Sequence, residues 1–274
     1  MSAIVDAQRA GWPVTRLSVR DATAELAPTR GGLVTSVTLG GRELLALDEA
    51  TLADASKNVR GGIPVLFPFA GKPPPDSPFA QHGFARLLPW QVVRREAAFD
   101  RVTVACALED GEATRAFPHR FQLTQTLTLT PGGAELVHEV LARSEAVPVH
   151  FGLHPYFAVD PARKAKVRVD ATAAEAYDNL TARRGPLPAF DFSGELDLHL
   201  PRPAQTRTAL ELGDGAVLEL DWDSTSQALV LWTQPGKPFV CVEPWSDLAL
   251  PLGGVTSTLR AGERVRYRLG LRLR

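Results

Sequence analysis

The sequence is poor in cysteine, in net charge and in long hydrophobic runs. Only two cysteines, Cys106 and Cys241, occur in 274 residues, which excludes a disulfide framework and a zinc site built from thiolates. Such low cysteine usage fits a reducing compartment, and we expect a cytoplasmic protein. The 30 lysines and arginines nearly balance the 31 aspartates and glutamates, so we expect neither nucleic acid nor membrane as a partner.

Membrane-spanning, secretory and helical signals are also scarce. No apolar run approaches the roughly 20 residues that a transmembrane helix needs. The N-terminal segment 1–6 has no basic region followed by a long apolar stretch, so a secretory signal is not expected. Residues 44–57 could hold a short helix, and no other stretch has a convincing helical period. These absences leave a β-rich globular protein.

Runs in which apolar and polar residues alternate occur along the chain, separated by turns rich in glycine and proline. Alternation with period two is typical of half-buried strands. The predicted strands include Arg101–Leu108, Phe121–Thr130, Ala134–Val140, Thr208–Leu212, Ala216–Leu220 and Arg264–Arg274. Because crossover helices are missing, parallel βαβ architecture is disfavoured and an all-β sandwich or barrel is favoured. No linker or repeat divides the chain, so residues 1–274 are expected to form one domain.

The segment 60–90 is unusually rich in proline and glycine and makes a poor regular strand. Its polar members are Arg60, Gln81, His82 and Arg86, and they stand among apolar neighbours. A pre-shaped loop of this kind can hold polar groups over a ligand. The alternative is that the two arginines are solvated and that His82 completes a turn. The proline-rich stretch Lys72–Pro78 is predicted to be a stiff loop.

Two further segments end in groups suited to acid–base chemistry. If residues 147–154 form a strand, His150 and His154 share one face and Pro155 ends the strand; His150 is interpreted as structural. Histidine titrates near neutrality and suits proton transfer, although a lone histidine is more often structural. An apolar strand ends in Glu243, where partial burial would raise the pKa of the carboxyl group toward that of a useful base. A salt-bridged glutamate is the alternative reading.

Metal binding is not expected from these residues. Two histidines and one glutamate can bind a metal, but four residues along a strand separate His150 from His154 by about 13 Å. Trp245, directly after the Glu243–Pro244 pair, can serve as a platform for stacking a sugar or can belong to the core.

Five motifs in order resemble the aldose 1-epimerase (galactose mutarotase-like) superfamily, in its branch of aldose and hexose-6-phosphate mutarotases. These motifs are Arg60–Pro64 with Phe67–Pro68, His82–Arg86 with Pro89–Trp90, Gly152–Phe157, Tyr177–Thr181 and Glu243–Trp245. The resemblance implies a large antiparallel β-sandwich whose open face binds one sugar, without a cofactor. It implies that His154 is the general acid, that Glu243 is the general base and that His82 polarises the substrate. It also suggests a carboxylate on the sugar hydroxyls, for which Asp197 is the candidate.

Mutarotation needs one proton removed from the anomeric hydroxyl and one delivered to the ring oxygen, for which two acid–base groups suffice. In the hexose-6-phosphate branch arginines hold the phosphate, and Arg60 and Arg86 resemble those positions. The expected partner is therefore a small sugar or sugar phosphate. The alternatives are a sugar-binding module without activity, a glycoside hydrolase or lyase, which usually needs two carboxylates, and a metal-dependent isomerase.

Overall fold

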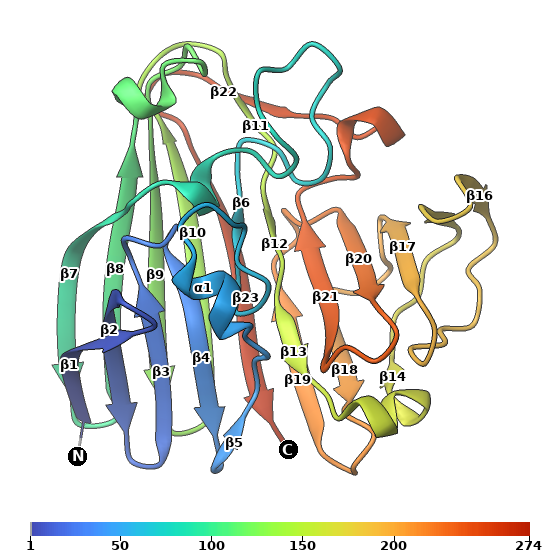
Figure 1. Cartoon of the computed structure of the whole chain (residues 1–274). Coiled ribbons are helices and arrows are strands. Elements are labelled where there is room, and N and C mark those ends of the chain that lie inside the picture. The colour runs from blue at the N-terminus through green and yellow to red at the C-terminus, as the bar shows by residue number, and fades with distance from the viewer. Residues whose placement is uncertain (1) are drawn as a thin grey trace.

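The computed structural model describes residues 2–274, and its architecture is all-β with large antiparallel sheets, as predicted (Figure 1). We call the sheet that begins at β14 and ends at β7 the back sheet. Its strands follow the order β14-β18-β19-β23-β10-β9-β8-β7, and each pairs antiparallel with its neighbours. Their bounds are β7 Gln91–Ala98, β8 Arg101–Glu109, β9 Phe121–Thr130, β10 Gly133–Ala142, β14 Arg168–Val169, β18 Arg207–Glu211, β19 Val217–Trp222 and β23 Arg264–Leu273.

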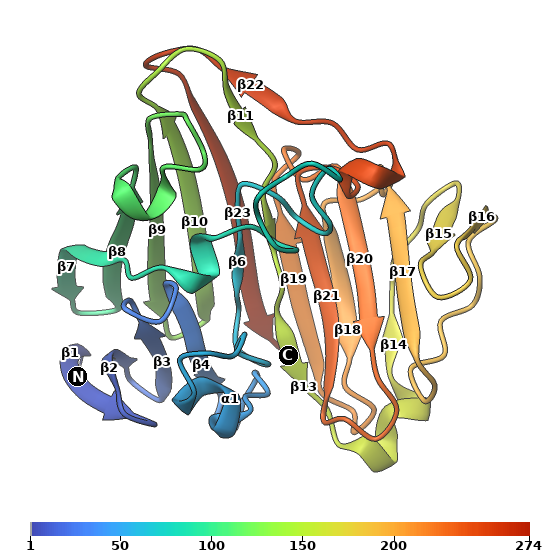
Figure 2. The ribbon, with the colours of Figure 1, turned by 45° about the horizontal axis from the view of Figure 1, so that its top comes forward.

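Two other sheets pack against the back sheet and form a second layer (Figure 2). The N-terminal sheet is a meander of β1 Ser2–Arg9, β2 Trp12–Val19, β3 Ala22–Ala27, β4 Leu33–Leu39 and β5 Arg42–Glu43. The front sheet has the order β16-β15-β17-β20-β21-β12-β6, with β13 also paired to β21. Its bounds are β6 Val65–Leu66, β12 Gly152–Leu153, β13 Tyr156–Ala158, β15 Ala176–Asp178, β16 Arg183–Gly185, β17 Leu196–Pro201, β20 Ala228–Thr233 and β21 Phe239–Trp245.

Short elements connect these sheets. A two-stranded ribbon pairs β11 Val147–Val149 with β22 Ser257–Leu259. The helical elements are α1 Glu49–Ala53 and the 3-10 turns η1 Ala85–Leu87, η2 Glu112–Thr114, η3 Pro161–Lys166 and η4 Leu250–Leu252. Among the described residues, no helix has the length and apolar character to cross a membrane.

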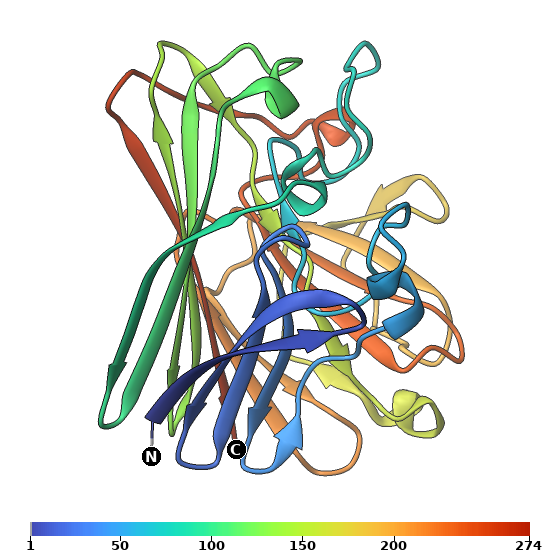
Figure 3. The ribbon, with the colours of Figure 1, turned by 60° about the vertical axis from the view of Figure 1, so that its left-hand side comes forward.

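The core lies between the two layers and consists of the inward-facing side chains of all three sheets. On β9, Phe121, Leu123, Leu127 and Leu129 are fully buried, which confirms the face predicted from alternation. Figure 3 shows the green strands of the back sheet as one layer, with the blue N-terminal strands beside it. Removing this apolar surface from water is the main force that holds the layers together.

The short helix expected within residues 44–57 is confirmed as the five residues of α1, which begins after its cap Asp48 and ends where the chain is extended again at Asp54. One local prediction needs correction. The single strand expected over 147–154 is broken into β11 and β12, and His150 lies between them. His150 and His154 therefore do not share the face of one strand.

The outer face of the front sheet is unusual because the residues of β21 that point to it are buried as well. On β21, Val240 and Val242 point into the core, so Cys241, Glu243 and Trp245 point to the opposite face. These outward residues are nevertheless buried, and residues of the neighbouring loops line a cavity over this face of the sheet. Glu243 and Trp245 on this face line a cavity.

Candidate active site

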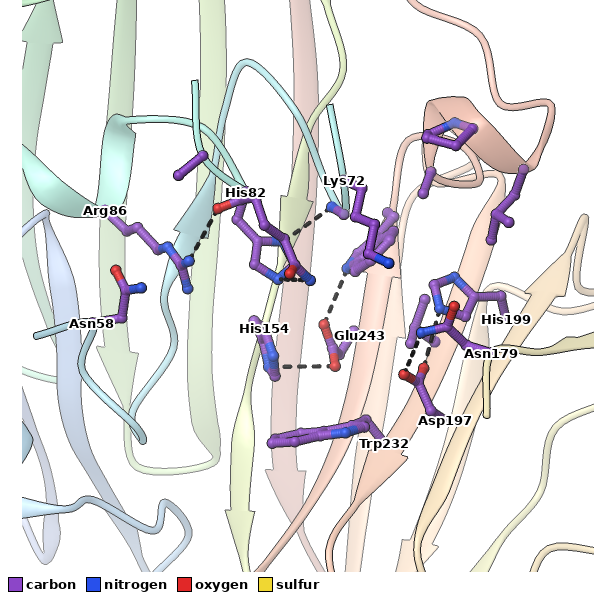
Figure 4. A pocket seen from close by; sticks show the side chains of 18 of the residues that line it. Asn58, Lys72, His82, Arg86, His154, Asn179, Asp197, His199, Trp232 and Glu243 are labelled. Atoms are coloured by element: carbon purple, nitrogen blue, oxygen red, sulfur yellow. Dashed lines mark hydrogen bonds and ion pairs between the residues drawn. The ribbon is translucent and has the colours of Figure 1, made fainter. Parts of the chain in front are cut away.

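A cavity of about 590 Å³ opens over the outer face of the front sheet, within the size range of small-molecule sites. It contains all eight residues that the sequence indicated as acid–base or binding groups. Those residues are Arg60, Gln81, His82, Arg86, His154, Asp197, Glu243 and Trp245. They come from β17, β21 and the loops around β12 and η1, so the fold gathers residues spread over most of the chain (Figure 4).

His154 and Glu243 face each other at the floor of the cavity. The Nδ1 atom of His154 lies 3.3 Å from Oε1 of Glu243, and the indole N–H of Trp245 donates to Oε2 at 3.2 Å. Glu243 is 1% exposed and His154 is 8% exposed. β12 and β13 pair with β21 in one continuous register, with Gly152 opposite Trp245 and Tyr156 opposite Cys241, and this places His154 opposite Glu243. The two groups form a buried pair at ion-pair distance, in which Nδ1 of His154 has no hydrogen-bond partner among the described residues.

Burial controls the charge of this pair. Desolvation, reinforced by the negative charge of Asp197, raises the pKa of Glu243 well above its ordinary value. Desolvation and the positive charge of Arg86 lower the pKa of His154 to about 3. Both shifts favour the neutral form of each group.

His82 is held by the backbone of the loop that precedes it. The amide of Gly71 donates to Nδ1 of His82 at 3.0 Å, and the amide of His82 donates to the carbonyl of Gly71 at 2.8 Å. Because Nδ1 accepts this bond, the neutral ring carries its hydrogen on Nε2. The side-chain nitrogen of Gln81 lies 3.2 Å from that Nε2, and turning the amide over would present its oxygen to the N–H. Burial, followed by the charge of Arg86, keeps the pKa of His82 low.

Asp197 is fixed by two neighbours that the sequence interpretation did not include in the site. The side-chain amide of Asn179 donates to Oδ2 at 2.7 Å, and Nε2 of His199 lies 3.1 Å from Oδ1. Asp197 and His199 are two residues apart on β17, so they share the outer face of the sheet. That spacing was the available signal for His199, and Asn179 belongs to one of the five motifs.

Aromatic rings form much of the remaining wall. Tyr156 stacks on His154 with a centroid separation of 4.6 Å, and Trp232 meets the same imidazole edge-on at 5.5 Å. Trp245 contacts both His82 and His199. Trp245 is only 3% exposed, so it packs beneath the polar groups and donates to Glu243 rather than offering an open stacking surface.

Three cationic side chains line the cavity, namely Arg60, Lys72 and Arg86. Within residues 2–274 no carboxylate lies at ion-pair distance from any of them. Arg86 donates to the carbonyl of Gln81 at 3.1 Å, while its buried Nε has no partner among the described residues. Lys72 comes from the proline-rich loop, which has no regular secondary structure, as predicted. Cations without an anionic partner favour binding of an anionic ligand.

One trio of donor atoms has the composition of a metal site. His154, Cys241 and Glu243 each place a donor atom within 4.8 Å of the others. A thiolate would be needed to bind a soft cation there. Burial raises the pKa of the Cys241 thiol well above its usual range, which opposes that ionisation.

Comparison with known families gives a clear assignment. The model of the family described as aldose 1-epimerase matches residues 17–271. The chain belongs to the aldose 1-epimerase family. The family resemblance inferred from the five motifs is therefore confirmed.

Three relatives carry the name "Putative glucose-6-phosphate 1-epimerase". The protein from Cenchrus ciliaris is 28% identical over 88% of this chain and 78% of its own length. The protein from Salmonella typhimurium is 32% identical over 47% of this chain, and the alignment spans only 42% of that relative. The protein from Escherichia coli K12 is 36% identical over 31% of this chain and 29% of its own length.

Solved structures of the same fold cover the whole chain. The Slr1438 protein from Synechocystis sp. PCC 6803 has a TM-score of 0.86 at 27% identity, covering 100% of this chain and 96% of its own. A structure titled "putative mutarotase (YeaD)" from Salmonella typhimurium has a TM-score of 0.85 at 21% identity, covering 98% and 93%. A galactose mutarotase-like protein from Clostridium acetobutylicum has a TM-score of 0.83 at 16% identity, covering 100% and 98%. The fold is thus galactose mutarotase-like.

Proposed function

We propose that this aldose 1-epimerase family member interconverts the α and β anomers of an aldohexose, with a hexose 6-phosphate as its favoured substrate. The observation that supports this most strongly is the contact between His154 and Glu243, 3.3 Å apart on the floor of the cavity. Two acid–base groups in contact at a sugar-sized cavity are what opening and closing of a hemiacetal requires.

The proposed reaction begins with the single proton of the pair. Moving it from Glu243 to Nδ1 of His154 gives a carboxylate and an imidazolium, and the number of protons in the pair does not change. Glu243 then accepts the proton of the anomeric hydroxyl, while Nε2–H of His154 protonates the ring oxygen. The C1–O5 bond breaks and C1 becomes an aldehyde. Rotation about C1–C2 and the reverse proton transfers close the ring on the other face.

His82 and Asp197 would hold the sugar for this step. With its hydrogen on Nε2, His82 can donate to an oxygen of the substrate and stabilise negative charge that develops there. Asp197 is oriented by Asn179 and His199, and its remaining lone pairs can accept hydrogen bonds from sugar hydroxyl groups. In this proposal the two residues fix the ring relative to the acid–base pair.

The three unpaired cations support a phosphorylated substrate. Arg60, Lys72 and Arg86 border the cavity that contains the acid–base pair, so one ligand could reach both groups. A phosphate carries close to two negative charges at neutral pH and is a strong acceptor for arginine and lysine. The names of the relatives agree with this substrate class.

The proposal is tested by anomer exchange measured with NMR saturation transfer on glucose, galactose and glucose 6-phosphate. We expect the protein to accelerate exchange and to prefer the phosphosugar. Binding of sugar without acceleration would instead indicate a sugar-binding module. Release of the aglycone from an aryl glycoside, with no acceleration of anomer exchange, would indicate glycoside hydrolysis.

A further inference from the structure

His150 is a buried polar residue that does not line the cavity itself. It is fully buried (0% exposed) between β11 and β12. Its Nδ1 accepts a hydrogen bond from the amide of Ala70 at 2.8 Å, and its Nε2 lies 2.8 Å from the carbonyl oxygen of Leu248. A carbonyl can only accept, so both contacts are satisfied by one form of the ring, the neutral tautomer with hydrogen on Nε2.

The two partners of His150 belong to two different loops that wall the cavity. Ala70 directly precedes Gly71, and Leu248 directly precedes Ala249. Gly71 and Ala249 line the cavity side by side, because a Cβ built on Gly71 would lie 2.6 Å from that of Ala249 and 3.1 Å from Trp245. Gly71 also has a φ of +84°, which favours glycine. His150 thus forms hydrogen bonds to two loops that are in close van der Waals contact with each other.

The same loop connects His150 to His82. Two successive backbone amides each donate to the Nδ1 atom of a histidine, Ala70 to His150 and Gly71 to His82. The second bond determines which nitrogen of His82 carries hydrogen. A shift of the Ala70–Gly71 peptide would therefore weaken the bond to His82 and let its ring adopt the other tautomer.

We propose that His150 is a positioning residue: by holding the Ala70 amide and the Leu248 carbonyl, it fixes the loop whose next amide keeps His82 in its Nε2–H form. This inference rests on the proposed function for its effect on turnover, whereas its effect on the His82 ring does not depend on that function. His150 touches no reacting atom, so its contribution passes through His82 and the cavity wall.

The test compares four variants. His150→Leu removes both hydrogen bonds. His150→Asn retains an acceptor near the position of Nδ1, whereas His150→Gln retains a donor that can reach Leu248. His138→Asn is the matched control, because His138 is equally buried (0% exposed), contacts Gln125 at 2.7 Å and has no bond to either loop. Thermal unfolding verifies that each variant folds.

The first readout is the tautomer of His82, observed by nitrogen-15 NMR of histidine-labelled protein and assigned with His82→Asn. We expect Nε2–H in the native protein, in His150→Asn and in His138→Asn, and a mixture of tautomers in His150→Leu and His150→Gln. If His150→Leu does not fold, the Asn and Gln variants decide. A His82 tautomer that is the same in all folded His150 variants overturns the proposal.

The second readout is steady-state anomer exchange. We expect His150→Leu to lower kcat about 10-fold to 100-fold, with a smaller rise in KM, and His150→Asn to recover most of that loss. An unchanged kcat in a folded His150→Leu protein overturns the positioning role. If the native protein accelerates no anomer exchange, the proposed function fails, while the tautomer measurement still decides the inference about His150.

Discussion

The back sheet and the front sheet of this protein have similar inner faces and very different outer faces. Both inner faces are apolar and contribute to one core. The outer face of the back sheet carries charged residues that find partners on neighbouring strands, such as Arg264 with Glu139 at 2.7 Å. The outer face of the front sheet carries Glu243, which is buried and contacts a histidine rather than a permanent cation.

The two outer faces differ in what determines the pKa of their charged groups. On the back sheet, Arg268 donates to Glu135 and Asp221, and these partners outweigh its partial burial and raise its pKa, so the charges stabilise one another. On the front sheet, burial dominates and raises the pKa of Glu243. A carboxyl group whose pKa is raised by burial is better suited to acid–base catalysis than an exposed one. The two sheets therefore differ in the burial of their outward-facing carboxyl groups rather than in their architecture.

The largest effect should come from removing the carboxyl group of the front sheet. We expect Glu243→Gln to lower kcat by about 1,000-fold, within the range for a general acid–base residue. The control is Glu135→Gln on the back sheet, which removes a carboxyl group that does not line the cavity of His154 and Glu243. Anomer exchange should be unchanged in that control. Similar losses in both variants would mean that the two faces do not differ in function.

Replacing the histidine of the pair should cause the next largest loss of activity. His154→Asn is expected to lower kcat by about 100-fold or more, because the ring oxygen then lacks its proton donor. In the proposed mechanism His154 and Glu243 act as one unit, so the double variant should be little worse than Glu243→Gln alone. Saturation-transfer rates of the three proteins give this comparison, and losses that multiply in full would show two independent groups.

Removing one of the unpaired cations should have an intermediate effect on substrate binding. Arg86→Ala should raise KM for glucose 6-phosphate by about 10-fold to 100-fold, as expected for a lost hydrogen bond between charged groups, with a much smaller change for glucose. Arg268→Ala, which removes a paired arginine of the back sheet, is the matched control and should change neither value. Equal losses of Arg86→Ala on both sugars would argue against phosphate binding.

A smaller effect should appear in stability as a function of pH. The pKa of Glu243 is raised in the folded protein, so its contribution to stability is fully present below its unfolded pKa and is lost as pH rises through the folded value. Glu243→Gln cannot ionise, and its Tm relative to the native protein should therefore increase between pH 5 and pH 9. Thermal unfolding of both proteins across this range checks the sign. A constant difference in Tm would contradict the burial argument.

The parts of the fold that the sequence predicted are those determined by local alternation. The hairpin of β9 and β10 and the strand β23 were indicated because neighbouring residues alone decide which side chains face the core. The break at His150 was not predicted, because it depends on hydrogen bonds to Ala70 and Leu248, which are 80 and 98 residues away in sequence. The pattern of residues 147–154 by itself is that of one continuous strand.

The residues of the candidate site also fall into those that local sequence indicated and those that were missed. His154 and Glu243 were indicated because each is a polar group at the end of an apolar segment. Asn179 was missed because it meets Asp197 only through the pairing of β15 with β17, a contact between strands that no local pattern encodes. His199 lies two residues from Asp197 on β17, and this local spacing was not used. The roles of all these residues in catalysis are our proposals.

The most direct test of the account is the rate of anomer exchange of glucose 6-phosphate, measured by saturation transfer with the native protein, Glu243→Gln and Glu135→Gln side by side. The account predicts strong acceleration by the native protein and by Glu135→Gln, and almost none by Glu243→Gln. Equal acceleration by all three proteins would contradict the claim that the covered face of the front sheet performs the chemistry.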